Sequence, residues 1–373
     1  MIKISPLKAL RPGKGIFDLM ISDQVNGKGH KNEQLSFEDI INLFGCALDD
    51  QPAIYVYEVR GDAGIMRGVW ATIDLSETNA ETIKRHEETV SSKVESLKAD
   101  RRSKTTEKSP ILLVHKKHKA LDALIDYVVR TRKPLATEWS QMGHFLYQVL
   151  EAELIEKFIR QFKAVEAVYL ADGHHRLEAA CSLQKNIPQQ ISSLFVSADV
   201  ISIAPFHRMV SATDISWPML MEKLGQYYYI SKIPNNKPYK PDQKNRLGLC
   251  FQGEWYQLDL NKTWEALSAK PDTVVLQDMI LSEVLGIHQP KVDERLTCFP
   301  DCKWSQFVSE LNNDNRSIGF SLFAMTADAF IAAAEKAEFL PPKSTWIAPK
   351  VPQGFMASSP VAITAKGEQI RIN

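Results

Sequence analysis

The chain has 373 residues, of which 44% are hydrophobic and 24% are charged. Because single hydrophobic cores usually stop growing near ~250–300 residues, this length predicts two lobes. Its 45 basic side chains are balanced by 45 acidic ones, which removes the electrostatic attraction behind most non-specific binding to nucleic acid. We therefore expect no nucleic-acid partner.

The sequence also indicates a cellular compartment. Its five cysteines are odd in number and widely scattered, which fits reduced thiols in a cytosol. The opening residues, MIKISPLKALRPGKG, lack the apolar core of a signal peptide, and no run approaches the ~18 apolar residues of a membrane span. We expect a cytoplasmic protein without a membrane partner.

The first half of the chain alternates strand and helix patterns. Two strand-like runs, 53–60 and 65–73, flank the turn 61–64 and predict a hairpin. The charged segment 77–108 has sparse apolar residues at near-helical spacing, which predicts a surface helix or a lid. The patterns that follow predict strands at 111–114, 144–149 and 167–171, and helices around 121–128 and 154–162.

The second half continues in the same mixed style. Strands are predicted at 193–196 and 200–203, a hairpin at 247–260, a strand at 318–324 and a helix at 327–337. The proline-rich stretch 234–245 is typical of a solvated connector. We place a boundary there, between a lobe 1–240 that carries the site and a lobe 241–373 that closes its cleft. The predicted fold class is α/β (α+β), with mixed sheets in two lobes.

The segment from Asp172 to Arg176 is the most informative. The strand at 167–171 ends at Asp172-Gly173, after which apolar residues fall at helical spacing, so strand, tight turn and helix follow in order. Gly173 permits backbone angles that are closed to other residues, and Asp172 can cap the helix while its first N–H groups point outward. Such unpaired donors attract anions such as phosphate.

His174, His175 and Arg176 occupy the first turn of this helix, where the helix dipole disfavours cationic side chains unless an anion binds. Arg176 can hold two phosphate oxygens, a histidine can carry a proton, and Asp172 can orient a hydroxyl or hold a metal. The alternative is that Asp172 is only a cap and the histidines are exposed. Neighbouring histidines diverge by ~100° on a helix, so no metal site built by the protein alone is predicted.

Three residues of the charged segment are further candidates. His86 and Glu87 lie beside two cations and can serve as proton carrier and base, the alternative being a solvated helix face. Arg101 can close over a polyanionic donor as part of a mobile lid, or be ordinary surface charge.

The segment PPKSTW at 341–346 combines rigid turn residues with a cation and two hydroxyls. Lys343, Ser344 and Thr345 can contact an anion, or they can belong to a fixed loop that Trp346 anchors. The sequence has no GK[ST] loop, no GxGxxG after a strand, no HExxH and no GxSxG. Standard kinase, dehydrogenase, zincin and esterase mechanisms are therefore not expected.

Five segments together carry a resemblance to a known family. They are YLADGHHR at 169–176, KRHEET at 84–89, LQD at 276–278, LGI at 285–287 and LPPKSTW at 340–346 with Pro349-Lys350 after it. The chain resembles, over most of its length, the bacterial and archaeal family called domain of unknown function 1015. That family usually has a Pro-Tyr-Asp segment after Leu10-Arg11-Pro12, whereas this sequence has Phe17-Asp18-Leu19-Met20.

The box ADGHHR at 171–176 also looks like the phosphate-binding loop of the ParB and sulfiredoxin superfamily, whose members include nucleotide-binding partition proteins and free-serine kinases. The resemblance implies a ParB/sulfiredoxin-like strand-loop-helix core that binds an anion. It also implies phosphoryl or nucleotide chemistry at this corner, with a kinase that makes phosphoserine as the sharpest candidate.

The leading interpretation is a small-molecule phosphotransferase of the free-serine kinase type. The corner, with Gly173 and Arg176, would hold the phosphates of ATP, ADP or pyrophosphate, Mg²⁺ would offset their charge, and Asp172 or Glu87 would orient or deprotonate the acceptor hydroxyl. The partners are then a small-molecule substrate and a phosphate donor, and a homodimer stays open. Two alternatives also stay open: a nucleotide-binding regulatory protein without turnover, and a phosphatase acting on a small phosphomonoester.

Overall fold

The computed structural model describes residues 1–11, 47–61, 64–75, 82–103, 107, 109–135, 143–184, 190–211, 213–348, 350–352 and 355–358. The chain forms two compact units, one comprising Met1–Ile201 with Pro349–Asn373 and the other Ser202–Ala348. Both contain helices and sheets, which confirms the predicted α/β class and the two lobes. Residues 17–20, where the sequence differs from the Pro-Tyr-Asp segment of the family that it resembles, lie outside the described residues.

The predicted boundary near residue 240, between lobes 1–240 and 241–373, falls inside the second unit. The stretch 234–245 connects β13 (Tyr228–Lys232) to β14 (Arg246–Phe251), and both strands belong to one sheet. Prolines and polar residues mark a break in regular structure whether it joins two domains or two strands. Local composition therefore located the break but not what it connects.

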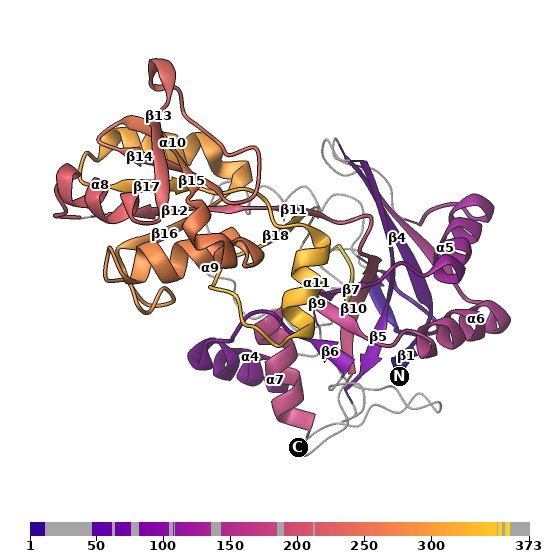
Figure 1. Cartoon of the computed structure of the whole chain (residues 1–373). Helices are drawn as coiled ribbons and strands as arrows, with labels where there is room; N and C mark the ends of the chain where they lie inside the picture. Colours follow the sequence, from indigo (N-terminus) through magenta and orange to yellow (C-terminus); the bar gives the residue numbers. More distant parts are fainter. Residues whose placement is uncertain are drawn as a thin grey trace. The chain divides into compact units, whose positions relative to one another are not determined.

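The first unit is built on a mixed sheet of eight described strands. The pairs β6–β9 and β7–β10 are parallel and the other neighbours are antiparallel. The carboxyl ends of β7 and β9 therefore lie at opposite ends of the sheet. In spatial order the strands are β6 (Ile83–Lys84), β9 (Val168–Asp172), β7 (Ile111–His115), β10 (Gln190–Ser197), β5 (Gly64–Asp74), β4 (Ile54–Gly61) and β8 (Gly143–Val149), with β1 (Ile4–Ser5) on β5 (Figure 1).

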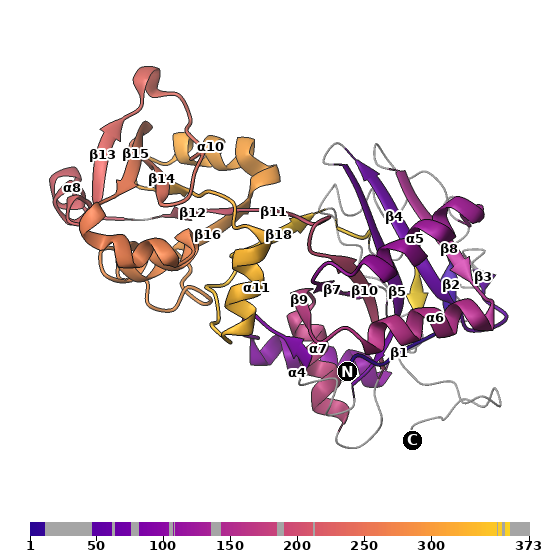
Figure 2. The same cartoon turned by 45° about the vertical axis from the view of Figure 1, so that its right-hand side comes forward.

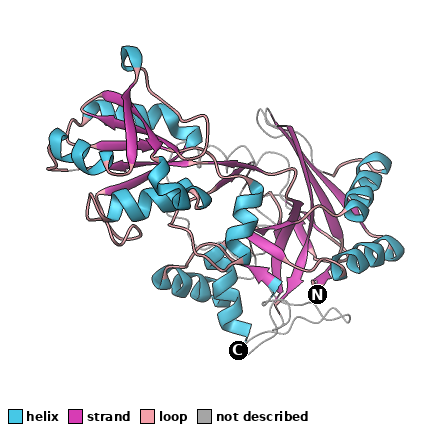
Figure 3. Ribbon diagram, in the orientation of Figure 1, coloured by secondary structure: helices cyan, strands magenta, loops and turns pink. Residues whose placement is uncertain are grey.

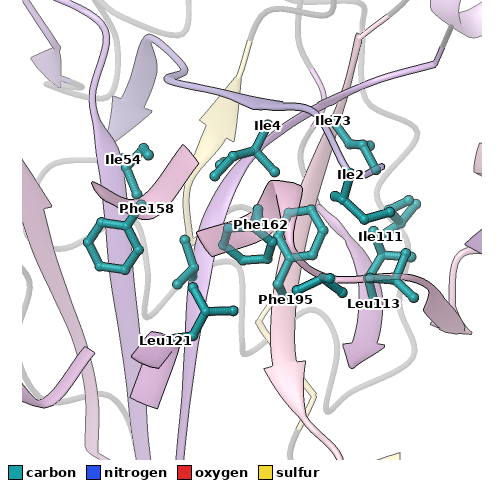
Figure 4. Close-up of a cluster of buried hydrophobic side chains, with 14 of the residues drawn as sticks. Ile2, Ile4, Ile54, Ile73, Ile111, Leu113, Leu121, Phe158, Phe162 and Phe195 are labelled. Atoms are coloured by element: carbon teal, nitrogen blue, oxygen red, sulfur yellow. The ribbon is translucent and has the colours of Figure 1, made fainter. Parts of the chain in front are cut away.

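Two amphipathic helices, α5 (Lys119–Thr131) and α6 (Ala152–Lys163), cover one face of this sheet (Figures 1 and 2). Their buried side chains, among them Leu121, Phe158 and Phe162, pack against the strand residues in the core shown in Figure 4. The predicted hairpin, the strand-helix unit after residue 111 and the elements from 144 to 171 are confirmed.

Two further helices of the described part of this unit, α4 (Ser91–Ser103) and α7 (His174–Gln184), pack against each other. Within the segment 77–108, predicted to be a surface helix or a lid, residues 91–103 form the helix α4, whereas residues 83–84 form β6 and no helix runs through 85–90. Residues 77–81 lie outside the described residues. Strand β6 obtains its backbone hydrogen bonds from β9, which is 85 residues away at the Ile83–Val168 pair. A charge pattern cannot report a partner so distant in sequence.

The last described residues return the chain to the first unit. Strand β19 (Ala357–Ser358) joins β2 (Ala9–Arg11) and β3 (Ala47–Leu48) in a small sheet. The Phe355 ring packs edge-on against Tyr57, with 5.5 Å between centroids. This segment is therefore anchored to the first unit by pairing and by packing.

The second unit has an antiparallel six-stranded sheet of described strands with helices on both faces (Figure 3). Helix α8 (Trp217–Gly225), α9 (Asp272–Val275) and the π-helix η3 (Leu276–Ser282) pack on one face, and α10 (Trp304–Asn313) packs on the other. The predicted hairpin at 247–260, the strand near 318 and the helix near 327 are confirmed.

The sheet order is β13, β15 (Glu254–Leu260), β14, β17 (Ile318–Ser321), β12 (Phe206–Val210) and β16 (Leu296–Pro300), and β11 (Ser202–Ala204) pairs separately with β18 (Trp346–Ala348). The other helices are α11 (Ala327–Glu335) and the short η1 (Pro234–Asn236), η2 (Lys262–Ala269) and η4 (Asp301–Lys303).

Two broad expectations can be compared with the described part of the chain. None of its helices is both long and apolar enough to cross a membrane. Cys181, Cys250, Cys298 and Cys302 are free thiols, as predicted, and Cys46 lies outside the described ranges.

Candidate functional site

The backbone of the predicted corner forms as expected. Strand β9 ends at Asp172, Gly173 has a φ of +98°, and α7 begins at His174. A Cβ atom on residue 173 would lie 2.7 Å from Ile111 Cγ2, closer than real side chains approach. Glycine is therefore required here both for its backbone angle and for the close passage of β7.

The Asp172 carboxylate faces two cations. Arg176 Nη2 donates to Asp172 Oδ2 over 3.0 Å, one turn along the helix. Lys350 Nζ, from the C-terminal segment, lies 3.5 Å from Asp172 Oδ1. The Asp172 side chain is 48% exposed, so the carboxylate is paired but still open to solvent.

Arg176 ties the corner to the loop before β7. Its Nη1 donates to the carbonyl oxygens of Ser109 and Pro110 over 2.6 and 2.7 Å. Burial lowers the pKa of Arg176 and the Asp172 carboxylate opposes this effect, so the guanidinium stays charged. Within the described part of the chain, three of its five N–H groups have acceptors and two do not.

His174 and His86 form a buried pair beneath the corner. Their rings meet edge-to-face with 4.6 Å between centroids, and their residues are 7% and 1% exposed. Burial lowers the pKa of His86 to about 4, and burial together with the nearby His86, Arg85 and His175 lowers the pKa of His174 to about 2. Both are neutral at pH 7. The alternatives of an exposed His174 and of a solvated face at His86 are therefore wrong.

His174 has one further property. Its Nε2 atom is buried without a hydrogen-bond partner among the residues that the structure describes. An unsatisfied buried polar atom costs free energy, so its retention at an otherwise well-formed helix start needs a reason.

The tertiary structure brings the segment 84–90 to the first turns of α7. His175 Nε2 accepts a hydrogen bond of 3.0 Å from Val90 N, and Arg85 forms an ion pair with Glu178. Glu87 lies half-buried between β6 and α4. The structure thus brings His86 and the segment that follows it to His174 and His175 at the start of α7.

Arg101 is held in the interior in this structure. Its side chain is 9% exposed, forms an ion pair with Glu107 and donates to the Gln190 carbonyl oxygen. Burial lowers the pKa of Arg101 to about 10. These contacts are those of a structural residue joining α4 to the sheet, and its role toward a donor stays a prediction.

The segment with Lys343, Ser344 and Thr345 belongs to the second unit. Ser344 Oγ donates to the Pro341 carbonyl oxygen over 2.6 Å, and Arg208 Nη2 donates over 3.0 Å to the carbonyl oxygens of Pro342 and of Lys343. Ser344 is 3% exposed, whereas Lys343 is exposed. Internal hydrogen bonds therefore fix this turn, and its predicted contacts with an anion stay predictions.

The residue that sequence reasoning missed at the corner is Lys350. It lies 174 positions beyond Arg176 and follows the second unit, so no local pattern connects it to Asp172. The one available signal was its place in Pro349-Lys350, directly after LPPKSTW in the family resemblance.

A protein-only metal site is not observed, since the described residues contain no group of three or more histidine, cysteine or acidic side chains arranged for a metal. The corner offers one carboxylate, Asp172, already facing two cations. Mg²⁺ is often held by one or two carboxylates together with substrate phosphates. The described residues at the corner fit that shared mode.

Comparison with known proteins gives one family. A family model described as protein of unknown function (DUF1015) matches residues 45–281. No curated protein matches the chain.

Several solved structures overlap the chain weakly. A free serine kinase variant in complex with AMP gives a TM-score of 0.40 at 13% identity, covering 75% of this chain and 87% of that one. A conserved hypothetical protein from Pyrococcus furiosus gives 0.38 at 13%, covering 76% and 93%. SbnI with a C-terminal truncation, from Staphylococcus aureus, gives 0.45 at 10%, covering 81% and 91%. Overlaps of this size do not define a common fold.

Proposed function

The chain belongs to the family described as protein of unknown function (DUF1015), as its sequence predicted, and we propose that it is a phosphotransferase whose ligand phosphate binds at Asp172–Arg176. The observation that carries the proposal is the corner itself. A glycine with a positive φ ends β9, a helix opens at once, and a half-exposed carboxylate lies there between two cations.

Phosphate binding is supported by donors of three kinds. The first N–H groups of α7 have no acceptor within the helix and carry the positive end of its dipole. Arg176 retains two N–H groups beyond its internal hydrogen bonds. Lys350 adds an ammonium group 3.5 Å from the carboxylate. Each of these favours an anion in front of the turn.

Transfer requires an acceptor and a base. Asp172 is exposed enough to reach a substrate, and a carboxylate is the usual group that orients an attacking hydroxyl. The acceptor oxygen forms a bond to phosphorus while the bond from phosphorus to the donor oxygen breaks, and the hydroxyl proton passes to the carboxylate. Glu87, on the segment beside α7, is the second candidate base.

The neutral histidines limit the roles open to them. His86 and His174, whose pKa values burial lowers, carry no charge at pH 7 and so cannot neutralise a phosphate. A neutral imidazole can still donate one hydrogen bond or accept one. The Nε2 atom of His174 is itself buried, so in this structure it is not open to a ligand in front of the turn.

The resemblance of ADGHHR to the phosphate loop of free-serine kinases supports a small hydroxyl-bearing acceptor such as L-serine. Mg²⁺, if used, would be shared between Asp172 and the phosphates of ATP, ADP or pyrophosphate, where it would offset their charge. Two other functions use the same site: nucleotide sensing without turnover, and hydrolysis of a small phosphomonoester.

Phosphorus NMR distinguishes these functions. The intact protein is incubated with Mg²⁺ and L-serine, and with ATP, ADP and pyrophosphate in turn. We expect a phosphoserine resonance with one donor. Nucleotide binding without any new resonance would favour the sensor, and release of phosphate from added phosphoserine without a donor would favour the phosphatase.

A pair of arginine variants controls this experiment. Arg176→Lys keeps a positive charge but removes the forked hydrogen bonds, and we expect at least a tenfold lower rate, the order of one charge-assisted hydrogen bond. Arg246→Lys is the matched control, because Arg246 also pairs with an aspartate four residues away, Asp242, at 2.7 Å. Equal rates in the two variants would remove Arg176 from the site.

A further inference from the structure

Lys350 lies on a segment whose C-terminal end is held against the first unit. The chain leaves the second unit after β18, which ends at Ala348, and by Phe355 it is packed against Tyr57. Strand β19 then pairs with β2, in register at Ala357 and Leu10. Between these points Lys350 Nζ lies 3.5 Å from Asp172 Oδ1.

Several charged side chains around the corner form ion pairs. Three ion pairs, Arg85–Glu178, Arg101–Glu107 and Arg176–Asp172, each match one positive with one negative group. His86 and His174 are neutral at pH 7, since burial lowers the pKa of each. Lys350 is a second cation at the Asp172 carboxylate, which already pairs with Arg176, and the positive end of the α7 dipole lies at the same turn.

The contact between Lys350 and Asp172 is not that of a tight structural pair. A charge-assisted hydrogen bond between nitrogen and a carboxylate is usually about 2.7–2.9 Å long. Here the atoms are 3.5 Å apart, and the two side chains are 47% and 48% exposed. Exposed ion pairs contribute little to stability, so this contact with Asp172 stabilises the fold only weakly.

We infer that Lys350 is a phosphate-binding residue of the corner and supplies the positive charge that Arg176 and Asp172 alone would lack. Without it, the charges of the guanidinium and the carboxylate offset each other, and only the helix N-terminus and the remaining N–H groups of Arg176 would attract an anion. The ammonium is a compact donor with three N–H groups on a flexible stem, so it can bind a phosphate oxygen beside the carboxylate. This inference rests on the proposed function.

Calorimetric titration with pyrophosphate tests it, using the full chain at low ionic strength in EDTA. We compare the wild type with Lys350→Ala and Lys350→Arg. The control is Lys117→Ala, which removes another exposed lysine paired with an aspartate, Asp199, over 2.5 Å. Lys117 follows β7 and so lies at the opposite end of the sheet from Asp172.

We expect Lys350→Ala to weaken pyrophosphate binding about tenfold or more, the order of one hydrogen bond to a charged group. Lys350→Arg should bind within about threefold of the wild type because the charge is kept, and Lys117→Ala should equal the wild type. The Lys350→Ala effect should shrink as salt is added. Thermal unfolding of each variant verifies that the fold is intact.

The outcomes separate the two levels of the proposal. If the wild type binds and Lys350→Ala binds equally well, Lys350 is only an ion-pair partner and the inference is overturned, while the proposed site stands. If the wild type does not bind pyrophosphate, the anion site itself is refuted and Lys350 has no such role.

Discussion

Two turns of this protein were predicted to contact an anion, and they differ in what their polar groups do. At the corner, Asp172 and Arg176 are 48% and 29% exposed, and two guanidinium N–H groups remain beyond those used internally. In the turn 341–345, Ser344 is 3% exposed and its hydroxyl donates to Pro341. Arg208 donates to the two following carbonyl oxygens.

The difference shows why residue types alone do not define a ligand site. Both turns combine a cation, a donor-rich backbone and a constrained residue, Gly173 at a φ of +98° and Lys343 at +60°. In the second turn, the Ser344 hydroxyl and the carbonyl oxygens of Pro342 and Lys343 form hydrogen bonds within the protein. At the corner, the Asp172 carboxylate is still half-exposed to solvent. A binding site requires hydrogen-bond donors that have no acceptor within the folded protein.

The largest effect that would sharpen this comparison comes from Asp172→Asn. We expect phosphotransfer to fall about 100-fold or more, because the amide cannot accept the hydroxyl proton. Pyrophosphate binding in EDTA should be at least as tight as in the wild type, since Arg176 and Lys350 would no longer face a negative charge. Phosphorus NMR gives the rate and calorimetry the affinity. Unchanged turnover would reduce Asp172 to an ion-pair partner.

Gly173→Ala tests the shape of the corner. The backbone has a φ of +98°, and the new Cβ would lie 2.7 Å from Ile111 Cγ2. We expect a loss of about 2–4 kcal/mol of unfolding free energy from strain and clash combined. Gly253→Ala is the control, since its φ is +76° but nothing lies within 4 Å of the added atom. Strain alone should cost about 1–2 kcal/mol there. Urea denaturation measures both, and equal losses would argue against close packing at the corner.

The buried histidine pair should make stability depend on pH. Because the pKa of folded His174 is lowered to about 2 from about 6.5 in the unfolded chain, only the unfolded state binds this proton in between. Stability is therefore complete above pH 6.5 and falls by up to about 1.4 kcal/mol per pH unit below it.

His174→Phe should reduce the loss between pH 7.5 and pH 5 by about 2 kcal/mol at most. The change also removes an unpartnered buried nitrogen, so stability at pH 7.5 should stay within about 1 kcal/mol of the wild type. Urea midpoints at both pH values measure this, with exposed His288→Gln as control. An unchanged pH dependence would mean that His174 is solvated in solution.

The smallest effect is expected in the second turn. Ser344→Ala removes the 2.6 Å hydrogen bond to Pro341 and should cost about 1 kcal/mol of stability. Turnover should not change. A clear fall in turnover at unchanged stability would break the comparison and return this turn to the ligand site.

The local structure of the site was predictable from the chain. The apolar run 167–171, the Asp172-Gly173 pair and the helical spacing after it specify strand, turn and helix within a dozen residues. Steric restrictions on φ make glycine nearly obligatory at such a turn, and they act through immediate neighbours. The same holds for α5 and α6, whose apolar stripes repeat at 3.6 residues.

Other features depended on contacts between distant segments. The pairing of β6 with β9 replaced a predicted helix and buried His86 against His174. The proline-rich stretch near 240 proved to join two strands of one sheet. In each case the sequence showed that a segment is charged or irregular. It did not show which distant segment of the chain this one contacts in the fold.

By itself, the sequence determined the α/β class, the family, and a strand-turn-helix corner able to attract an anion, because these follow from short-range sterics, periodicity and motif. Only the tertiary structure decided which charges meet there. Lys350 comes to Asp172 from 178 positions away, and Arg176 is tied to Ser109 and Pro110, which precede the neighbouring strand β7. The net charge of a site is a sum over neighbours in space, and a linear pattern does not contain those neighbours.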